Sequence, residues 1–303
     1  MFEAAVEAVI AGDIPTLEKL LADDPGLIRA RSTQKHRATL LHYVSANGVE
    51  DIRQKTPPNA VEVAKVLLDA GAVVDALADA YGRGATLGLV ASSVHPLRAG
   101  VQIPLLELLL ERGAAVDGPA GTWQPLIAAL ANGRAKAAEF LASRGAKLDL
   151  EGAAGVGRLD VVKSFFNEDG SLKSVATKEQ IDSGFGWACE YGRTEVVRFL
   201  LDRGVDLRSQ AHGQTGLHWA VVGGQLETIG LLLERGGPLE EKNVHGGTVL
   251  GQATWCVVHS DSGVDYVPII ETLLNAGADV QKTLYPTGNA RVDELLRRHG
   301  RNL

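Results

Sequence analysis

Residues 215–236 read Thr-Gly-Leu-His-Trp-Ala-Val-Val-Gly-Gly-Gln-Leu-Glu-Thr-Ile-Gly-Leu-Leu-Leu-Glu-Arg-Gly, and this stretch indicates the fold. Thr215 has a hydroxyl that can cap a helix, and Gly223 and Gly224 accept the tight turn that ends one. A second helix with apolar residues at helical spacing follows and stops at Gly236. Neither helix is long enough to be stable alone in water. We therefore expect this pair to pack against neighbours.

The same unit recurs along the chain. The glycine that ends the second helix also occurs at Gly71, Gly113, Gly145, Gly204 and Gly277. We predict that first helices open at Thr39, Thr86, Gln124, Ser183, Thr215 and Thr248. The interval from Thr215 to Thr248 is 33 residues. We expect the leucine pairs of the second helices to be buried between repeats, as at Leu67/Leu68, Leu232/Leu233 and Leu273/Leu274.

The combination of Thr-x-Leu-His-x-Ala, a glycine turn, a Leu-Leu helix and Gly-Ala-Asp-Val resembles the ankyrin repeat. Residues 39–75, 215–236 and 277–280 match it best, and degenerate units extend the resemblance over nearly the whole chain. It implies an all-α ankyrin-repeat solenoid of about eight helix-turn-helix units, with short β-hairpin fingers and a C-terminal capping helix at 290–299. Its stacked repeats imply a single domain over 1–303.

Two kinds of departure from the repeat are expected to matter. Near 145–182 one hairpin is lost and a longer polar segment, 167–182, follows, so a sub-domain junction would fall there. Three units carry extra residues between their two helices, near 49–59, 95–102 and 256–266. Insertions of this kind map to one end of a repeat array, where they can form a common lip.

Composition excludes several classes of partner. The net charge of −7 and the scattered basic residues argue against nucleic acid and anionic membranes. The first residues carry two acids where a secretory signal carries Lys or Arg, and no stretch approaches the roughly 20 apolar residues of a membrane span. We expect a cytoplasmic protein with no nucleic-acid and no membrane partner.

Strong catalytic and cofactor motifs are absent from the sequence, including the phosphate-binding loop, the nucleophile elbow, His-Glu-x-x-His and Cys-x-x-Cys pairs. We therefore predict no cofactor and no metal site. The resemblance implies that His42 and His218 form hydrogen bonds within and between turns, and a role as bases is the less favoured alternative.

The aromatic residues suggest a binding surface. Trp187 and Trp219 share one position after the histidine slot, and all four Trp belong to first helices or hairpin edges. In an ankyrin stack these elements line the concave side, and Trp and Tyr are favoured binding anchors. Packing between repeats is the alternative explanation, which stays open here. The predicted binding residues are Tyr81, Trp123, Trp187, Glu190, Tyr191, His212, Trp219 and Trp255.

The function that we predict is binding of a partner protein through the concave face. The alternative is an enzyme for a small polar or aromatic molecule, in a pocket between that face and the inserted loops. Its acid–base candidates are Glu190, Tyr191, Asp261, His95 and His259. His259 and Asp261 with Asp265 could also ligate a metal, although solvated loop residues explain that spacing better.

Overall fold

The protein forms two compact units, Met1–Lys147 and Leu148–Leu303. The structure is a computed structural model that describes residues 1–46, 53–81, 83–260 and 263–300. The division between the units falls inside 145–182, the stretch in which the sequence predicts an irregular repeat. The expectation of one domain over 1–303 stays a prediction.

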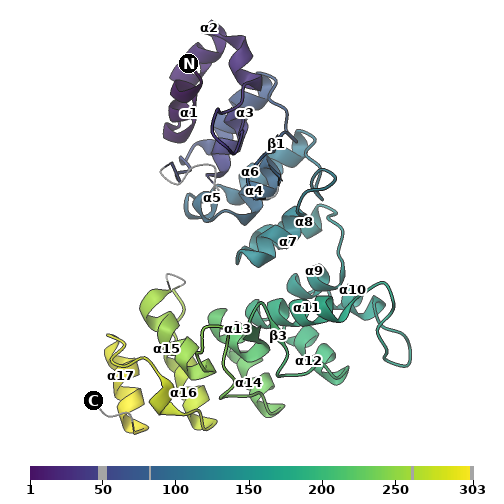
Figure 1. Ribbon diagram of the computed structural model, residues 1–303, viewed down its shortest axis with the longest axis vertical. Helices are drawn as coiled ribbons and strands as arrows, with labels where there is room; N and C mark the ends of the chain where they lie inside the picture. The colour runs from purple at the N-terminus through teal and green to yellow at the C-terminus, as the bar shows by residue number, and fades with distance from the viewer. Residues whose placement is uncertain (47–52, 82, 261–262, 301–303) are drawn as a thin grey trace. The chain divides into compact units, whose positions relative to one another are not determined.

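The described part of the first unit contains four helix pairs (Figure 1). The first members of the pairs are α1 (Phe2–Ala11), η2 (Leu40–Ser45), α4 (Thr86–Ser92) and α7 (Pro125–Ala131), and each contacts the next. The second members are α2 (Ile14–Asp23), α3 (Ala60–Asp69), α6 (Gln102–Glu111) and α8 (Ala135–Ser143), which also contact one another in order. The 3-10 turn η1 (Pro25–Arg29) lies between the first and second pairs. The short helix α5 (Val94–Arg98) lies within the third pair, between α4 and α6.

The described part of the second unit contains four more pairs, so the expectation of about eight is confirmed. Its first helices are α9 (Leu150–Gly155), α11 (Lys178–Glu190), α13 (Gly216–Val222) and α15 (Val249–His259). Its second helices are α10 (Leu159–Ser164), α12 (Thr194–Asp202), α14 (Leu226–Glu234) and α16 (Val267–Asn275). The 3-10 turn η3 (Val280–Lys282) precedes α17 (Ala290–Arg298), which packs on α16 as the predicted capping helix.

Hairpin fingers precede several first helices. In one, β1 (Leu77–Ala78) pairs with β2 (Gly84–Ala85), and in another β3 (Gln210–Ala211) pairs with β4 (Gln214–Thr215), both antiparallel. The tips require left-handed backbone, with φ values of 47° at Tyr81 and 51° at His212. We call the surface made by the first helices and the turns before them (30–39, 72–81, 83–85 and 114–124; 205–215 and 237–248), together with the turn 278–289 before α17, the finger side of each unit. The surface made by the second helices is called the back.

One predicted helix start was wrong, and two of the predicted insertions are partly helical. The helix predicted to open at Ser183 begins at Lys178, because Thr177 and Gln180 form a capping box there. Of the three insertions, 95–102 contains α5, and in 256–266 the helix α15 continues to His259. The insertion near 49–59 lies partly outside the described residues.

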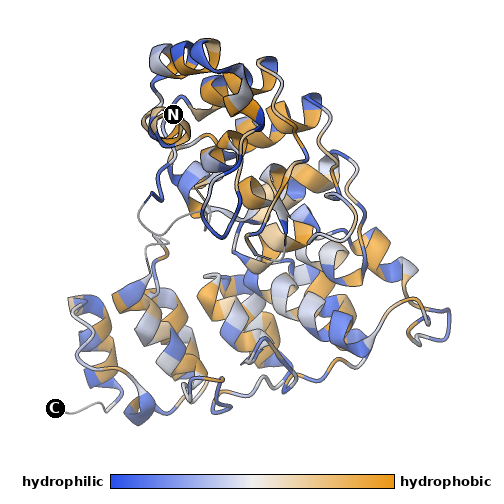
Figure 2. Ribbon diagram, turned by 45° about the horizontal axis from the view of Figure 1, so that its top comes forward, coloured by the Kyte–Doolittle hydropathy of each residue, from blue (hydrophilic) through white to orange (hydrophobic). Residues whose placement is uncertain are grey.

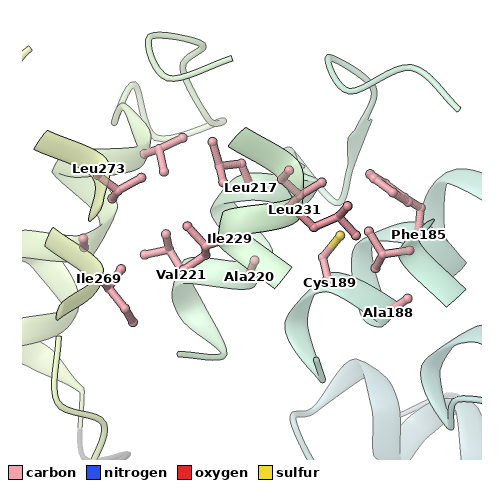
Figure 3. Close-up of a cluster of buried hydrophobic side chains, with 14 of the residues drawn as sticks. Phe185, Ala188, Cys189, Leu217, Ala220, Val221, Ile229, Leu231, Ile269 and Leu273 are labelled. Carbon is pink, nitrogen blue, oxygen red and sulfur yellow. The ribbon is translucent and has the colours of Figure 1, made fainter. Parts of the chain in front are cut away.

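Leucine burial follows the stacking of the repeats. Leu67, Leu232 and Leu273, the first members of the leucine pairs, are fully buried. Adjacent helical residues point in different directions, so Leu68 and Leu233 are only half-buried and the prediction for them was wrong. Figure 2 shows that apolar and polar residues alternate along the helices. In the second unit, apolar side chains of α11, α13, α14 and α16 form one cluster (Figure 3).

Truncation of one buried leucine should therefore weaken the stack. Leu232→Ala is expected to cost about 2–5 kcal/mol of unfolding free energy through lost transfer energy and a cavity. Leu226→Ala on the same helix, where the side chain is 42% exposed, should change it by less than about 0.5 kcal/mol. Urea unfolding of both variants checks this, and equal losses would contradict the packing.

Candidate functional site

Three aromatic side chains are exposed in the described residues: Tyr81 (66%), Trp123 (61%) and Trp255 (51%). Each lies on the finger side of its own unit. Tyr81 is at the tip of the β1–β2 finger, Trp123 immediately precedes α7, and Trp255 is on α15. The sequence singled out each of them as a binding residue, and the structure leaves each ring accessible to a partner.

The two tryptophans of the shared position are placed differently. Trp187 is buried and stacks on His212 with ring centroids 6.1 Å apart. Trp219 is half-buried, and its Nε1 donates a hydrogen bond to the Ala211 carbonyl at 3.0 Å. Both rings thus fix the β3–β4 finger against the first helices, and they present little area to a partner.

The Trp123 pocket lies between two neighbouring repeats of the first unit and has a volume of about 340 Å³. One wall comes from the Tyr81 finger and α4, and the other from the turn before α7 and α7 itself. Its lining residues are Tyr81, Gly84, Ala85, Gly88, Leu89, Ser92, Gly118, Thr122, Trp123, Pro125, Ala128, Ala131 and Asn132. Two of the three exposed aromatic residues therefore border one pocket.

The Trp255 pocket lies on the finger side of the second unit and has a volume of about 960 Å³. The Trp255 ring stacks on His259 at 4.7 Å, and His259 Nδ1 lies 3.0 Å from the Trp255 carbonyl oxygen. Other lining residues include Gln252, His245 and Lys282. Each pocket thus combines an exposed tryptophan with the third residue of a first helix, which is Gly88 in α4 and Gly251 in α15.

In two other repeats that third residue is a histidine that links neighbouring repeats. His42 Nδ1 lies 2.8 Å from Thr39 Oγ1, and its Nε2 lies 2.9 Å from the carbonyl oxygen of Ala76, ahead of the next finger. His218 bridges Thr215 Oγ1 (2.8 Å) and the Gly247 carbonyl oxygen (3.1 Å) in the same way.

These links confirm the structural role of both histidines. Burial is the main reason that the pKa of His42 is lowered to about 4 and that the pKa of His218 is lowered, so both rings stay neutral. At both pockets, glycine occupies the position of this histidine. The glycine at this position of α4 was not recognised from the sequence, because Thr86 was taken as the helix cap equivalent to Thr39. The cap residue of α4 is in fact Ala85.

Glu190 and Tyr191 lie at the end of α11 and do not line either pocket. Burial raises the pKa of Glu190 to about 7, and a hydrogen bond with Tyr191 opposes this rise. Glu151 on α9, which the sequence did not single out, has a pKa of about 7 through burial and the nearby Asp149 charge. Buried carboxyl groups of this kind arise from tertiary packing that local sequence does not reveal.

The remaining candidates do not converge on one site. His95 lies on α5 in the first unit, and burial followed by the charges of Arg98 and Arg134 lowers its pKa. His259 stacks on Trp255, and Asp261 lies outside the described residues. Asp265 accepts a hydrogen bond from the Val267 amide at the start of α16.

Residues 1–46, 53–81, 83–260 and 263–300 contain neither a metal-binding cluster nor a helix that could span a membrane. Within them, no group of three or more His, Cys, Asp and Glu could hold a metal ion. In the same ranges, no helix combines the length and the apolar character that a membrane crossing needs.

Helix pairs that contact only their neighbours define a helical repeat protein. The family model for ankyrin repeats (3 copies) matches residues 150–243 and 185–283. A solved structure, the human ASB11 ankyrin repeat domain, has 21% sequence identity and a TM-score of 0.46, covering 91% of this chain and 98% of that chain. A comparison with curated proteins finds no match. The repeats of residues 150–283 are therefore ankyrin repeats, and ankyrin repeats generally act as protein-interaction scaffolds.

Substitution of two threonines at helix starts should change the free energy of unfolding in opposite directions. The Thr86 hydroxyl is buried and makes no hydrogen bond in the described part of the chain. Thr86→Val should therefore raise the free energy of unfolding by about 1 kcal/mol. Thr215→Val removes the helix cap and the contact to His218, and should lower it by about 1–2 kcal/mol. Chemical denaturation measures both, and a loss in both variants would contradict the assignment.

Glu190→Gln should change how stability depends on pH. The ordinary value of 4.5 applies to the unfolded chain and about 7 to the folded one. Between these values the folded protein keeps a proton that the unfolded chain has lost, so stability falls as the pH rises. Glutamine cannot titrate. The free energy of unfolding of the variant should therefore rise relative to that of the wild type by up to about 3 kcal/mol as the pH increases from 4 to 8. Contributions of the other titratable groups cancel in this difference between variant and wild type. If the two curves of unfolding free energy against pH run parallel, the Glu190 carboxyl is not buried.

Proposed function

We propose that this protein binds a partner protein through its finger side. One observation carries the proposal: the exposed aromatic residues of the described chain, Tyr81, Trp123 and Trp255, are all on that side. Each also borders a pocket. Large rigid rings beside a pocket are the usual anchors of protein interfaces, where a few residues contribute most of the binding energy.

The back of each unit has no exposed aromatic side chain in the described residues, which supports this choice. Successive second helices are joined there by exposed ion pairs, as between Arg112 and Asp69 (2.8 Å) and between Arg235 and Asp202 (2.9 Å). Solvated pairs of this kind contribute little energy, and interface centres are depleted in charge. Exposed ion pairs also join the fingers of the second unit, as between Arg208 and Glu241 (3.0 Å), so it is the exposed aromatic rings that favour the finger side as the interface.

The enzyme alternative gains no support from geometry. Among its described candidates, His259 lines the Trp255 pocket, but Glu190 and Tyr191 line neither pocket. A general acid or base must lie within reach of the bound substrate. Partner binding is therefore the function that the site supports best.

The test compares aromatic variants with a variant on the back. A tagged full-length chain is used to capture partners from a native lysate, since we expect a cytoplasmic protein. Trp123→Ala and Trp255→Ala each remove an exposed ring, so at least one should weaken capture by about 1–4 kcal/mol. Leu226→Ala removes an exposed apolar side chain from α14 and should leave capture unchanged.

Folding of each variant is checked by its far-UV circular dichroism and melting temperature. Unchanged capture by the folded Trp123→Ala/Trp255→Ala double variant would move the interface elsewhere. Loss only in Leu226→Ala would place it on the back.

A further inference from the structure

The first two fingers of the first unit are hydrogen-bonded to each other. The Asp79 amide donates to the His36 carbonyl (2.6 Å), which joins the tip of the first finger to the β1–β2 finger. Arg31 reinforces this contact, because its Nη1 donates both to the Arg37 carbonyl (2.9 Å) and to the Leu77 carbonyl (2.7 Å). Residues at the two tips therefore lie side by side.

Three exposed cations lie at these tips: Lys35 and Arg37 on the first finger, and Arg83 on the second. None of them forms an ion pair with an acid in the described part of the chain. The fingers of the second unit differ, because Arg208 pairs there with Glu241 (3.0 Å). The charge of the first two tips is therefore available to a ligand.

Asp79 is the one carboxylate at the tips, counted over the described residues 33–37, 79–81 and 83. Its side chain pairs with none of the three cations. Three cations against one carboxylate leave a surplus of two positive charges, although the whole chain carries a net charge of −7. Such a local surplus attracts an anionic group in spite of the total charge.

The backbone at two of these cations has a conformation that favours glycine. The φ angle is 52° at Arg37 and 75° at Arg83. A side chain in this region is sterically disfavoured, and glycine would avoid the cost. Unfavourable backbone conformations of this kind are concentrated at functional sites. The two arginines therefore serve binding better than they serve folding.

The number of cations decides which anion fits these tips. Proteins that hold nucleic acid by its backbone commonly make about 6–10 phosphate contacts, and basic clusters that bind anionic lipids contain about 4–8 Lys or Arg. Three cations beside one carboxylate are too few for either. A short acidic peptide needs only two or three carboxylates, which guanidinium groups bind through paired hydrogen bonds.

We infer that the tips of the first two fingers bind a short acidic segment of the partner protein, whose carboxylates pair with Lys35, Arg37 and Arg83. Tyr81, two residues before Arg83, adds an exposed ring beside these charges. Arg31 holds the two fingers together, since its Nη1 already serves two backbone carbonyls. This inference rests on the proposed function, because it names the partner's chemistry at one part of the finger side.

The probe is a displayed library of random dodecapeptides selected on the full-length chain at low salt. Enriched peptides should contain two or three clustered Asp or Glu residues. The best peptide is labelled, and its affinity is measured by fluorescence anisotropy. Replacing its acids by Asn and Gln should weaken binding at least about tenfold. Added salt should also weaken binding, because it screens exposed charges.

The matched protein variants are Arg37→Gly/Arg83→Gly and Lys19→Gln/Lys136→Gln, which change the net charge equally. Glycine suits the positive φ at both arginine positions, so the glycine variant should keep or raise its melting temperature. It should nevertheless bind the peptide at least about tenfold more weakly. Lys19 on α2 and Lys136 on α8 are exposed cations of the back, and their replacement should leave binding unchanged.

Three outcomes would overturn the inference: no enriched peptide, enriched peptides without acidic clusters, or equal binding by the folded glycine variant. Tight binding of a labelled oligothymidylate that the glycine variant loses would assign the tips to nucleic acid instead.

A comparison with the captured partner separates this inference from the proposed function. If Trp123→Ala/Trp255→Ala loses the partner but the glycine variant retains it, the partner-binding function stands and the acidic segment does not. If neither variant loses the partner and no peptide is enriched, both proposals fail.

Discussion

The stacking of each helix pair on the next is the interaction on which the rest of this protein depends. Within each unit, buried apolar residues lie between neighbouring pairs, as Val221 of α13 and Ile269 of α16 do in one cluster (Figure 3). Full burial of such a side chain is worth about 1.5–3 kcal/mol, whereas the exposed ion pairs on the back contribute about 0–1 kcal/mol each. Apolar burial between repeats is therefore the dominant stabilising contribution.

The finger side adds a second kind of link between neighbouring repeats. A buried neutral histidine at the third position of a first helix ties its own cap to the next finger, as His42 does with Thr39 and Ala76. In α4 and α15 this residue is Gly88 or Gly251, and a pocket with an exposed tryptophan lies beside it. The first helices beside both pockets therefore lack this link, as do α7 and α9, whose third residues are Ile127 and Gly152.

The repeats, their eight helix pairs and the capping helix were predictable because apolar spacing and helix-ending glycines are local signals. Tyr81, Trp123 and Trp255 could also be chosen from the sequence as candidate binding residues, since aromatic residues on fingers and first helices are readily recognised there. The burial of Trp187 was not, because it depends on the His212 ring of another repeat. The pockets were missed for a similar reason. Their position follows from the register of Gly88, which becomes visible only when the start of α4 is known.

Covalent footprinting of the free protein and of its complex with the captured partner tests the central claim most directly. Hydroxyl radicals modify accessible aromatic rings, so binding on the finger side should protect Tyr81, Trp123 or Trp255, which are at least half exposed in the free chain. Phe140 on α8, a ring of the back that lies against Arg144, should be modified equally in both states. Protection of Phe140 with unchanged modification of the three finger-side rings would contradict the account.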